Sequence, residues 1–217
     1  MSRVAKFGLV VIVCMLVTAA AASVGFCCYS GLLVIPTAQT VGDGQYSYEF
    51  QTDGVIQGMA AETRLFNNEF GIGDRLELGV DVDLDSQCIS RVLGNGKYVA
   101  YRSHSGDLSA AFGVSNLAHR WKSAPFVVGS TRAGLVHFHL GAMSIDGRAC
   151  AICGIDRELG KLTLMADYTG GKDGLASVGF NYQIKESFGI MAGALLPNGD
   201  QDAGFTMHLV WCEPLKL

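Results

Sequence analysis

The chain has 217 residues, of which 49% are hydrophobic and 17% are charged, and its net charge is −4 at pH 7. This length fits one domain, because all-β chains of this size commonly fold as a single unit. An acidic balance without a long run of Lys and Arg argues against a nucleic-acid-binding protein, since phosphate binding requires clustered cations.

The N-terminus has the three regions of a secretory signal peptide. Arg3 and Lys6 precede an uncharged run that ends in small residues from Ala20 to Ser23. A retained membrane helix is the alternative, but a spanning helix needs about 20 predominantly apolar residues, and this run turns to Ala, Ser and Gly after Val17. We therefore predict that residues 1–22 are cleaved, which makes the mature chain more acidic.

The rest of the chain is predicted to contain an extended segment over residues 23–45 and one β-barrel domain over residues 46–217. In residues 75–84 the sequence is RLELGVDVDL, with apolar side chains at every second position and mainly ionised ones between them. This period of two is typical of a β-strand with one apolar face. Turn residues such as Asp53-Gly54, Asn95-Gly96 and Asp146-Gly147 separate such segments. The pattern predicts about twelve strands, near residues 46–52, 59–67, 74–84, 96–103, 107–116, 125–132, 135–144, 148–155, 161–169, 174–184, 187–196 and 203–212.

The links between these strands favour a membrane barrel. Tight links occur at Ser105-Gly106, Ala133-Gly134 and Lys185-Glu186, whereas most of the alternate links are longer or more polar. Short turns on one rim and long loops on the other are typical of outer-membrane barrels. We predict an all-β, up-and-down antiparallel transmembrane β-barrel in the outer membrane. A soluble secreted β-sandwich binding module stays an alternative, because its core would be equally free of charge.

The last predicted strand has Phe205, Met207, Leu209 and Trp211 on one face and Thr206 and His208 on the other. This strand resembles the signal that the barrel-assembly machinery reads, although Cys212–Leu217 extend beyond the aromatic residue. We therefore expect outer-membrane lipid and that machinery as partners.

Six cysteines remain after signal cleavage, and an oxidising compartment allows one to three disulfides among them. Cys150 and Cys153 form a CxxC pair, but on a strand these two positions face opposite sides. We therefore predict neither a metal site nor a redox site, and no cofactor.

The segment Gly31-Leu32-Leu33-Val34-Ile35-Pro36-Thr37-Ala38, followed by Gly44-Gln45-Tyr46-Ser47-Tyr48, resembles the start of the YjbH-type outer-membrane β-barrel proteins associated with exopolysaccharide biosynthesis and export. Residues 73–80 are similar to a turn and strand of the same group, and residues 166–170 are more faintly similar. The resemblance implies a barrel connected with exopolysaccharide or envelope biogenesis. From the residues themselves, Pro36 predicts an extended lead into the first strand.

The main functional hypothesis is a structural or transport-related barrel with a narrow polar lumen, which contacts a polysaccharide or small solute and is not an enzyme. Twelve strands enclose a space that side chains can fill, whereas wide channels need about 16 to 18. The predicted lumen-lining residues are Glu77, Asp81, Asp83 and Asp167, paired with Arg64 and Arg75, together with His137, His139 and His208.

An outer-membrane lipid-modifying hydrolase is the second hypothesis. His137 and His139 project to the same side of a strand and would supply a base for a serine nucleophile or ligands for a metal. The sequence contains no G-x-S-x-G or HExxH motif, and no aspartate is visible that would orient either histidine. Polar lumen histidines are the simpler interpretation.

Overall fold

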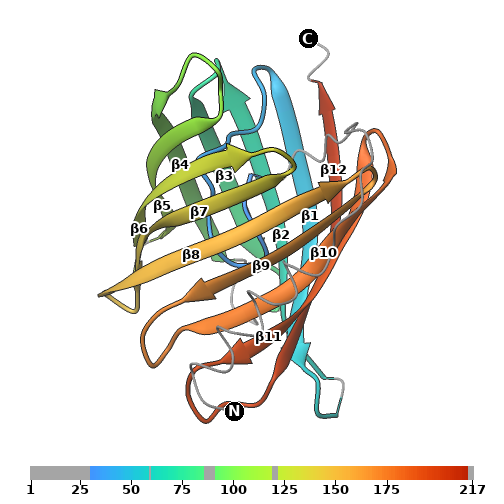
Figure 1. The fold of residues 1–217 in the computed structure, drawn as a ribbon. Coiled ribbons are helices and arrows are strands. Elements are labelled where there is room, and N and C mark those ends of the chain that lie inside the picture. Colours follow the sequence, from blue (N-terminus) through green and yellow to red (C-terminus); the bar gives the residue numbers. More distant parts are fainter. Residues whose placement is uncertain (1–29, 59, 86–90, 119–121, 215–217) are drawn as a thin grey trace.

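The computed structural model describes residues 30–58, 60–85, 91–118 and 122–214. Twelve antiparallel strands form a closed barrel in which each strand pairs with its sequence neighbours and β1 pairs with β12 (Figure 1). The described residues form no helix long and apolar enough to cross a membrane. The strands are β1 (Gln45–Val55), β2 (Ala60–Ile72), β3 (Leu76–Asp83), β4 (Arg91–Arg102), β5 (Leu108–Leu117), β6 (Ala124–Ala133), β7 (Val136–Ile145), β8 (Arg148–Leu159), β9 (Leu162–Thr169), β10 (Leu175–Lys185), β11 (Phe188–Pro197) and β12 (Gly204–Pro214).

The closed sheet confirms the predicted barrel and its strand number. The sandwich alternative is wrong, because one sheet closes on itself and the described residues form no second sheet against its apolar face. The predicted signal peptide, residues 1–22, lies outside the described residues.

The two rims differ in the length of their links. One rim, called the short-turn rim below, carries the turns after the even-numbered strands, and glycines such as Gly106 and Gly134 take positive φ angles of 78° and 66° there. The opposite rim carries longer connections, including residues 170–174 and 198–203, and is called the long-loop rim. The predicted asymmetry of the links is therefore confirmed.

Two predicted turns lie inside strands instead. Asp53-Gly54 belongs to β1 and Asn95-Gly96 to β4, and the strand register shifts at both places. Asn95 Nδ2 donates to Asp81 Oδ2 at 2.6 Å, and its Oδ1 accepts the Asn116 N–H at 3.0 Å. These contacts on both sides keep Asn95 in the sheet, so β4 starts earlier than the glycines around it predict.

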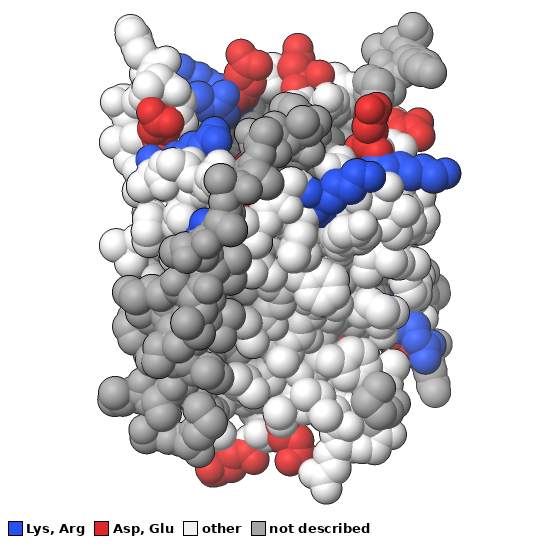
Figure 2. Space-filling view, turned by 45° about the vertical axis from the view of Figure 1, so that its right-hand side comes forward, with Lys and Arg blue, Asp and Glu red and all other residues white. Residues whose placement is uncertain are grey.

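The outward face of the barrel is apolar. Leu140 is 70% exposed and Val127 is 58% exposed, although both are aliphatic. On the face shown in Figure 2, most charged side chains gather towards the two ends, and the wide band between them is uncharged apart from a basic side chain at its right-hand edge. Aromatic rings pack together near the short-turn rim, where the ring centroid of Trp211 lies 5.4 Å from that of Tyr48 and 4.6 Å from that of Phe188. This arrangement is typical of the apolar band and aromatic girdle of membrane barrels.

The segment before β1 lies inside the barrel. Residues 30–41, called the plug below, form a small hairpin in which Gly31 bridges Pro36 and Leu32 N–H donates to Ile35 O at 2.9 Å (Figure 1). The prediction of an extended segment is therefore wrong for these residues, because the lumen offers the apolar residues around Pro36 a place to be buried.

Candidate functional site

Apolar side chains of the plug pack against glycines of the barrel wall. Leu32, Leu33 and Ile35 are each at most 3% exposed. A Cβ atom at Gly154 in β8 would collide with the ends of the Leu32 and Ile35 side chains. A Cβ atom at Gly179 or Gly193 would come within 3 Å of Leu33. Glycine in these inward positions makes room for the plug, since any larger residue would occupy the same space.

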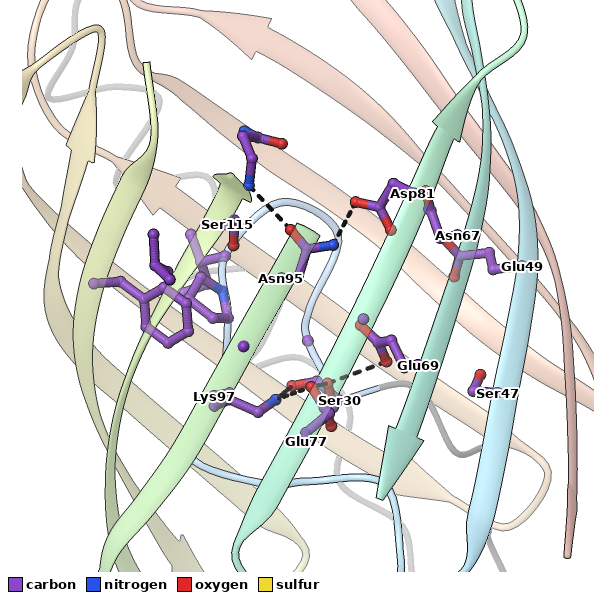
Figure 3. A pocket seen from close by; sticks show the side chains of 18 of the residues that line it. Ser30, Ser47, Glu49, Asn67, Glu69, Glu77, Asp81, Asn95, Lys97 and Ser115 are labelled. Atoms are coloured by element: carbon purple, nitrogen blue, oxygen red, sulfur yellow. Dashed lines mark hydrogen bonds and ion pairs between the residues drawn. The ribbon is translucent and has the colours of Figure 1, made fainter. Parts of the chain in front are cut away.

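Glu77 in β3 forms the main polar anchor of the plug. Its carboxylate accepts the Ser30 hydroxyl at 2.8 Å and the Val41 N–H at 2.8 Å, and it pairs with Lys97 at 3.0 Å (Figure 3). Lys97 Nζ also donates to Ser30 O at 3.1 Å. Both charged side chains are nearly fully buried, so each compensates the other away from solvent.

Asp167 in β9 forms a second anchor on the opposite wall. Its Oδ2 accepts the Val34 N–H at 3.1 Å, and its Oδ1 accepts the Ser177 hydroxyl at 2.6 Å. Asp167 is fully buried. The tip of the plug is therefore held by a carboxylate that is itself oriented by the neighbouring strand β10.

The third anchor is a relay across β6, β7 and β8. Ser130 Oγ accepts the Ala38 N–H at 2.9 Å and lies 2.7 Å from His139 Nδ1. His139 Nε2 lies 2.8 Å from Asp156 Oδ1, and His137 Nδ1 lies 2.8 Å from Asp156 Oδ2. An aspartate therefore orients both histidines, which the sequence analysis did not identify, because Asp156 lies on the neighbouring strand.

The plug separates two cavities in the lumen. One cavity, of about 310 Å³, lies between the plug and the wall formed by β1 to β5 and is called the acidic cavity below. The other, of about 610 Å³, extends to the short-turn rim, where Arg102, Arg132 and Lys161 line it together with Asp107 and Glu158. The described lumen is thus filled only in part, and both remaining spaces have polar walls.

The acidic cavity is lined by carboxylates and amides (Figure 3). Its charged lining residues are Glu49, Glu69, Glu77, Asp81 and Lys97.

Glu49 belongs to a ring of hydrogen bonds across β12, β1 and β2. Its Oε1 accepts Asn67 Nδ2 at 2.8 Å and lies 2.8 Å from His208 Nδ1. His208 Nε2 contacts Thr206 Oγ1 at 2.6 Å, and Thr206 Oγ1 donates to Asp53 Oδ1 at 2.6 Å. Gln51 completes the ring, because its Nε2 donates to Asp53 Oδ2 and its Oε1 accepts Asn67 Nδ2. The ring locks the seam at which the barrel closes.

Most of the predicted lumen residues face the lumen. The inward positions hold Glu77, Asp81, Asp83, Asp167, His137, His139 and His208, and Asp83 lies near the long-loop end of β3. Arg64 does not line the lumen, because it lies on the outward phase of β2 and pairs with Asp85 at 3.2 Å. Arg75 lies exposed in the turn between β2 and β3. Among the described residues, Lys97 is instead a buried cation of the lumen. The sequence analysis did not identify it, because the adjacent Asn95-Gly96 pair favours a turn.

Within the described residues, no group of three or more His, Cys, Asp or Glu could hold a metal ion. Cys150 and Cys153 are free thiols, whereas Cys212 is disulfide-bonded. Cys150 pairs in register with the inward-facing Met143, and Cys153 pairs with the outward-facing Leu140, so the two thiols face opposite sides as predicted.

No protein-family model matches the chain, and no curated protein matches it. Among solved structures, KdgM porin superposes with a TM-score of 0.59 at 12% identity, covering 76% of this chain and 98% of the porin. KdgM porin in complex with disordered oligogalacturonate gives a TM-score of 0.57 at 11% identity, covering 77% and 98%. Outer membrane phospholipase A from Escherichia coli gives a TM-score of 0.44 at 11% identity, covering 80% and 91%. The chain therefore has the fold of porin-like outer-membrane β-barrels.

Proposed function

We propose that this protein is an outer-membrane barrel that takes small polar solutes into its lumen and that the plug controls their passage. The observation that carries the proposal is the position of the plug between two polar cavities. A purely structural barrel of this size can fill its interior with side chains alone. Here the interior keeps open space on both sides of a separate hairpin.

The way the plug is held supports a movable closure. The plug forms no ladder with the barrel strands, and the wall contacts its backbone through the side chains of Glu77, Lys97, Ser130 and Asp167. A barrel strand, by contrast, is bonded along its whole length to two neighbours. Displacing the plug therefore breaks far fewer hydrogen bonds than opening the wall.

The resemblance to YjbH-type proteins covers mainly residues 31–84 and so includes most of this plug. On that resemblance we propose a place for the barrel in exopolysaccharide or envelope biogenesis. Deletion of the gene is expected to lower the amount of exopolysaccharide at the cell surface, and an unchanged amount would contradict this part of the proposal.

Conductance across a planar lipid bilayer tests the channel. The wild-type protein is expected to show low conductance with rare openings. Gly154→Leu should raise the open fraction at least several-fold, because its side chain occupies the space of Leu32 and Ile35. Gly129→Leu is the matched control, since Gly129 faces outward on β6 and a Cβ atom there has no neighbour nearer than 3.8 Å.

Equal conductance in both variants and the wild type would contradict the proposed gating. A heat-modifiability gel confirms that each variant still forms a closed barrel before its current is recorded.

One observation favours a second candidate function, a hydrolase. Ser130, His139 and Asp156 are in relay order, with separations of 2.7 and 2.8 Å, and Ser130 and Asp156 line the larger cavity. A serine oriented in this way can act as a nucleophile when a histidine accepts its proton. The relay faces the lumen, so its substrate would be an ester in the cavity rather than a membrane lipid.

Labelling with a fluorophosphonate probe tests the second candidate. Covalent labelling of the Gly154→Leu protein, absent after a further Ser130→Ala change, would support it. If the Gly154→Leu protein, in which the plug is displaced, is not labelled, the hydrolase hypothesis is contradicted. The relay would then serve only to hold Ala38 of the plug.

A further inference from the structure

Two buried acceptor atoms, on residues that line the acidic cavity, receive no hydrogen bond from the described residues. They are Oε2 of Glu49, a residue only 3% exposed, and Oδ1 of Asn67. The two residues are direct register partners on β1 and β2, and both line the cavity. An unsatisfied buried acceptor is costly, so it indicates a donor that comes from elsewhere.

The hydrogen-bond ring explains why only acceptors remain. The Asn67 amide nitrogen serves both Glu49 Oε1 and Gln51 Oε1, and the Gln51 amide nitrogen serves Asp53. The carboxylates of Glu49 and Asp53 can only accept hydrogen bonds. The amide groups of Asn67 and Gln51 must therefore point their nitrogen atoms towards these carboxylates, which fixes the orientation of both amides. Both N–H groups of Asn67 are used within the ring, so the unsatisfied atoms that Glu49 and Asn67 retain are acceptors.

The charge of the cavity indicates the kind of donor. Four carboxylates line it, from Glu49, Glu69, Glu77 and Asp81, and Lys97 is the single cationic side chain among its described lining residues. Lys97 is already bound to Glu77 and Ser30. A neutral polyol would donate hydrogen bonds to the acceptors but would not compensate the negative charge of the carboxylates. An ammonium group would donate hydrogen bonds and also compensate that charge.

We propose that the acidic cavity binds a small organic cation whose ammonium group donates to Glu49 and Asn67. This inference rests on the proposed uptake of small polar solutes and names their chemical class. A bare metal ion is a poorer fit, since the described residues contain no cluster of His, Cys, Asp and Glu able to hold one. An anionic ligand such as the oligogalacturonate bound to KdgM porin would meet four carboxylates.

Calorimetric titration of the detergent-solubilised full chain tests the site with three linear probes of four carbons. Putrescine carries two ammonium groups, butanediol two hydroxyls and succinate two carboxylates. Putrescine is expected to bind saturably, with neither of the other probes binding at the same concentrations. Glu49→Gln should weaken putrescine binding about tenfold or more, since hydrogen bonds to charged groups have about that effect.

Asp81→Asn provides a second variant, because Asp81 lines the same cavity but lies outside the ring. Asp81→Asn should weaken putrescine binding. It also keeps the test valid if the heat-modifiability gel shows that the Glu49→Gln protein does not form a closed barrel. Glu158→Gln is the matched control, since Glu158 lines the other cavity. The Glu158→Gln protein should bind putrescine with the same affinity as the wild type.

Two results would overturn the site: butanediol binding as tightly as putrescine, or putrescine binding unchanged in both Glu49→Gln and Asp81→Asn. The titration needs no membrane current. A protein that binds putrescine but never conducts would therefore contradict the proposed channel and leave the binding site standing.

Discussion

The wall of the barrel and the plug inside it are stabilised in different ways. Each wall strand pairs with a neighbouring strand on both sides, and side chains along it face the lumen and the outside in alternation. The plug has one internal bridge, between Gly31 and Pro36, and depends on a few side chains from distant strands. Single substitutions can therefore change the plug without opening the wall.

The largest effect is expected at the charged anchor that joins the two regions. Glu77→Ala removes three contacts of the carboxylate and leaves Lys97 buried without its counterion. We expect a loss of about 3–5 kcal/mol in the free energy of unfolding, measured by urea titration in lipid vesicles. Adding Lys97→Met should recover much of this loss, because it removes the buried charge; a double variant as unstable as Glu77→Ala would contradict this explanation.

One substitution made in both regions compares them directly. Leu33→Ala in the plug empties a buried position and should weaken docking of the plug by about 2–5 kcal/mol. Leu140→Ala on the outward face of the wall should cost only about 0.5 kcal/mol, the typical contribution of a leucine to transfer into lipid. Limited proteolysis of the plug should distinguish the two, and equal cleavage rates would show that the plug is not a separate unit.

The wall itself can be tested for contact with lipid. Leu140→Arg, in the middle of β7, should reduce the free energy of folding into vesicles by about 2–4 kcal/mol. Leu108→Arg, at the start of β5 near the short-turn rim, should cost about 0–1 kcal/mol. Equal costs at the two depths would indicate that the outward face does not meet a bilayer.

The smallest effect is expected for the ion pair outside the lumen. Arg64 and Asp85 are 3.2 Å apart, and the arginine side chain is 52% exposed. Arg64→Ala should therefore change the free energy of unfolding by less than about 1 kcal/mol. A larger loss would indicate that Arg64 has a role in the barrel that its exposed position does not explain.

The alternation of the sequence was enough to predict the wall. Hydrophobic residues at every second position predict that His137, His139 and His208 lie on the inward face, because successive side chains of a strand point to opposite sides. The same rule gave the wrong face for Arg64, because the adjacent polar residues Asn67 and Asn68 interrupt the alternation along β2. Lys97 was not predicted to line the lumen, because the glycines beside Asn95 favour a turn at this place in the sequence.

The sequence by itself determined the fold class, the strand number and the face on which most polar residues lie, because these follow from local periodicity and turn residues. Only the tertiary structure decided which charges meet and what fills the lumen. Val34 and its acceptor Asp167 are 133 positions apart in the chain. Such contacts exist only after β1 pairs with β12, because the plug can be buried only in a lumen that closure of the sheet creates.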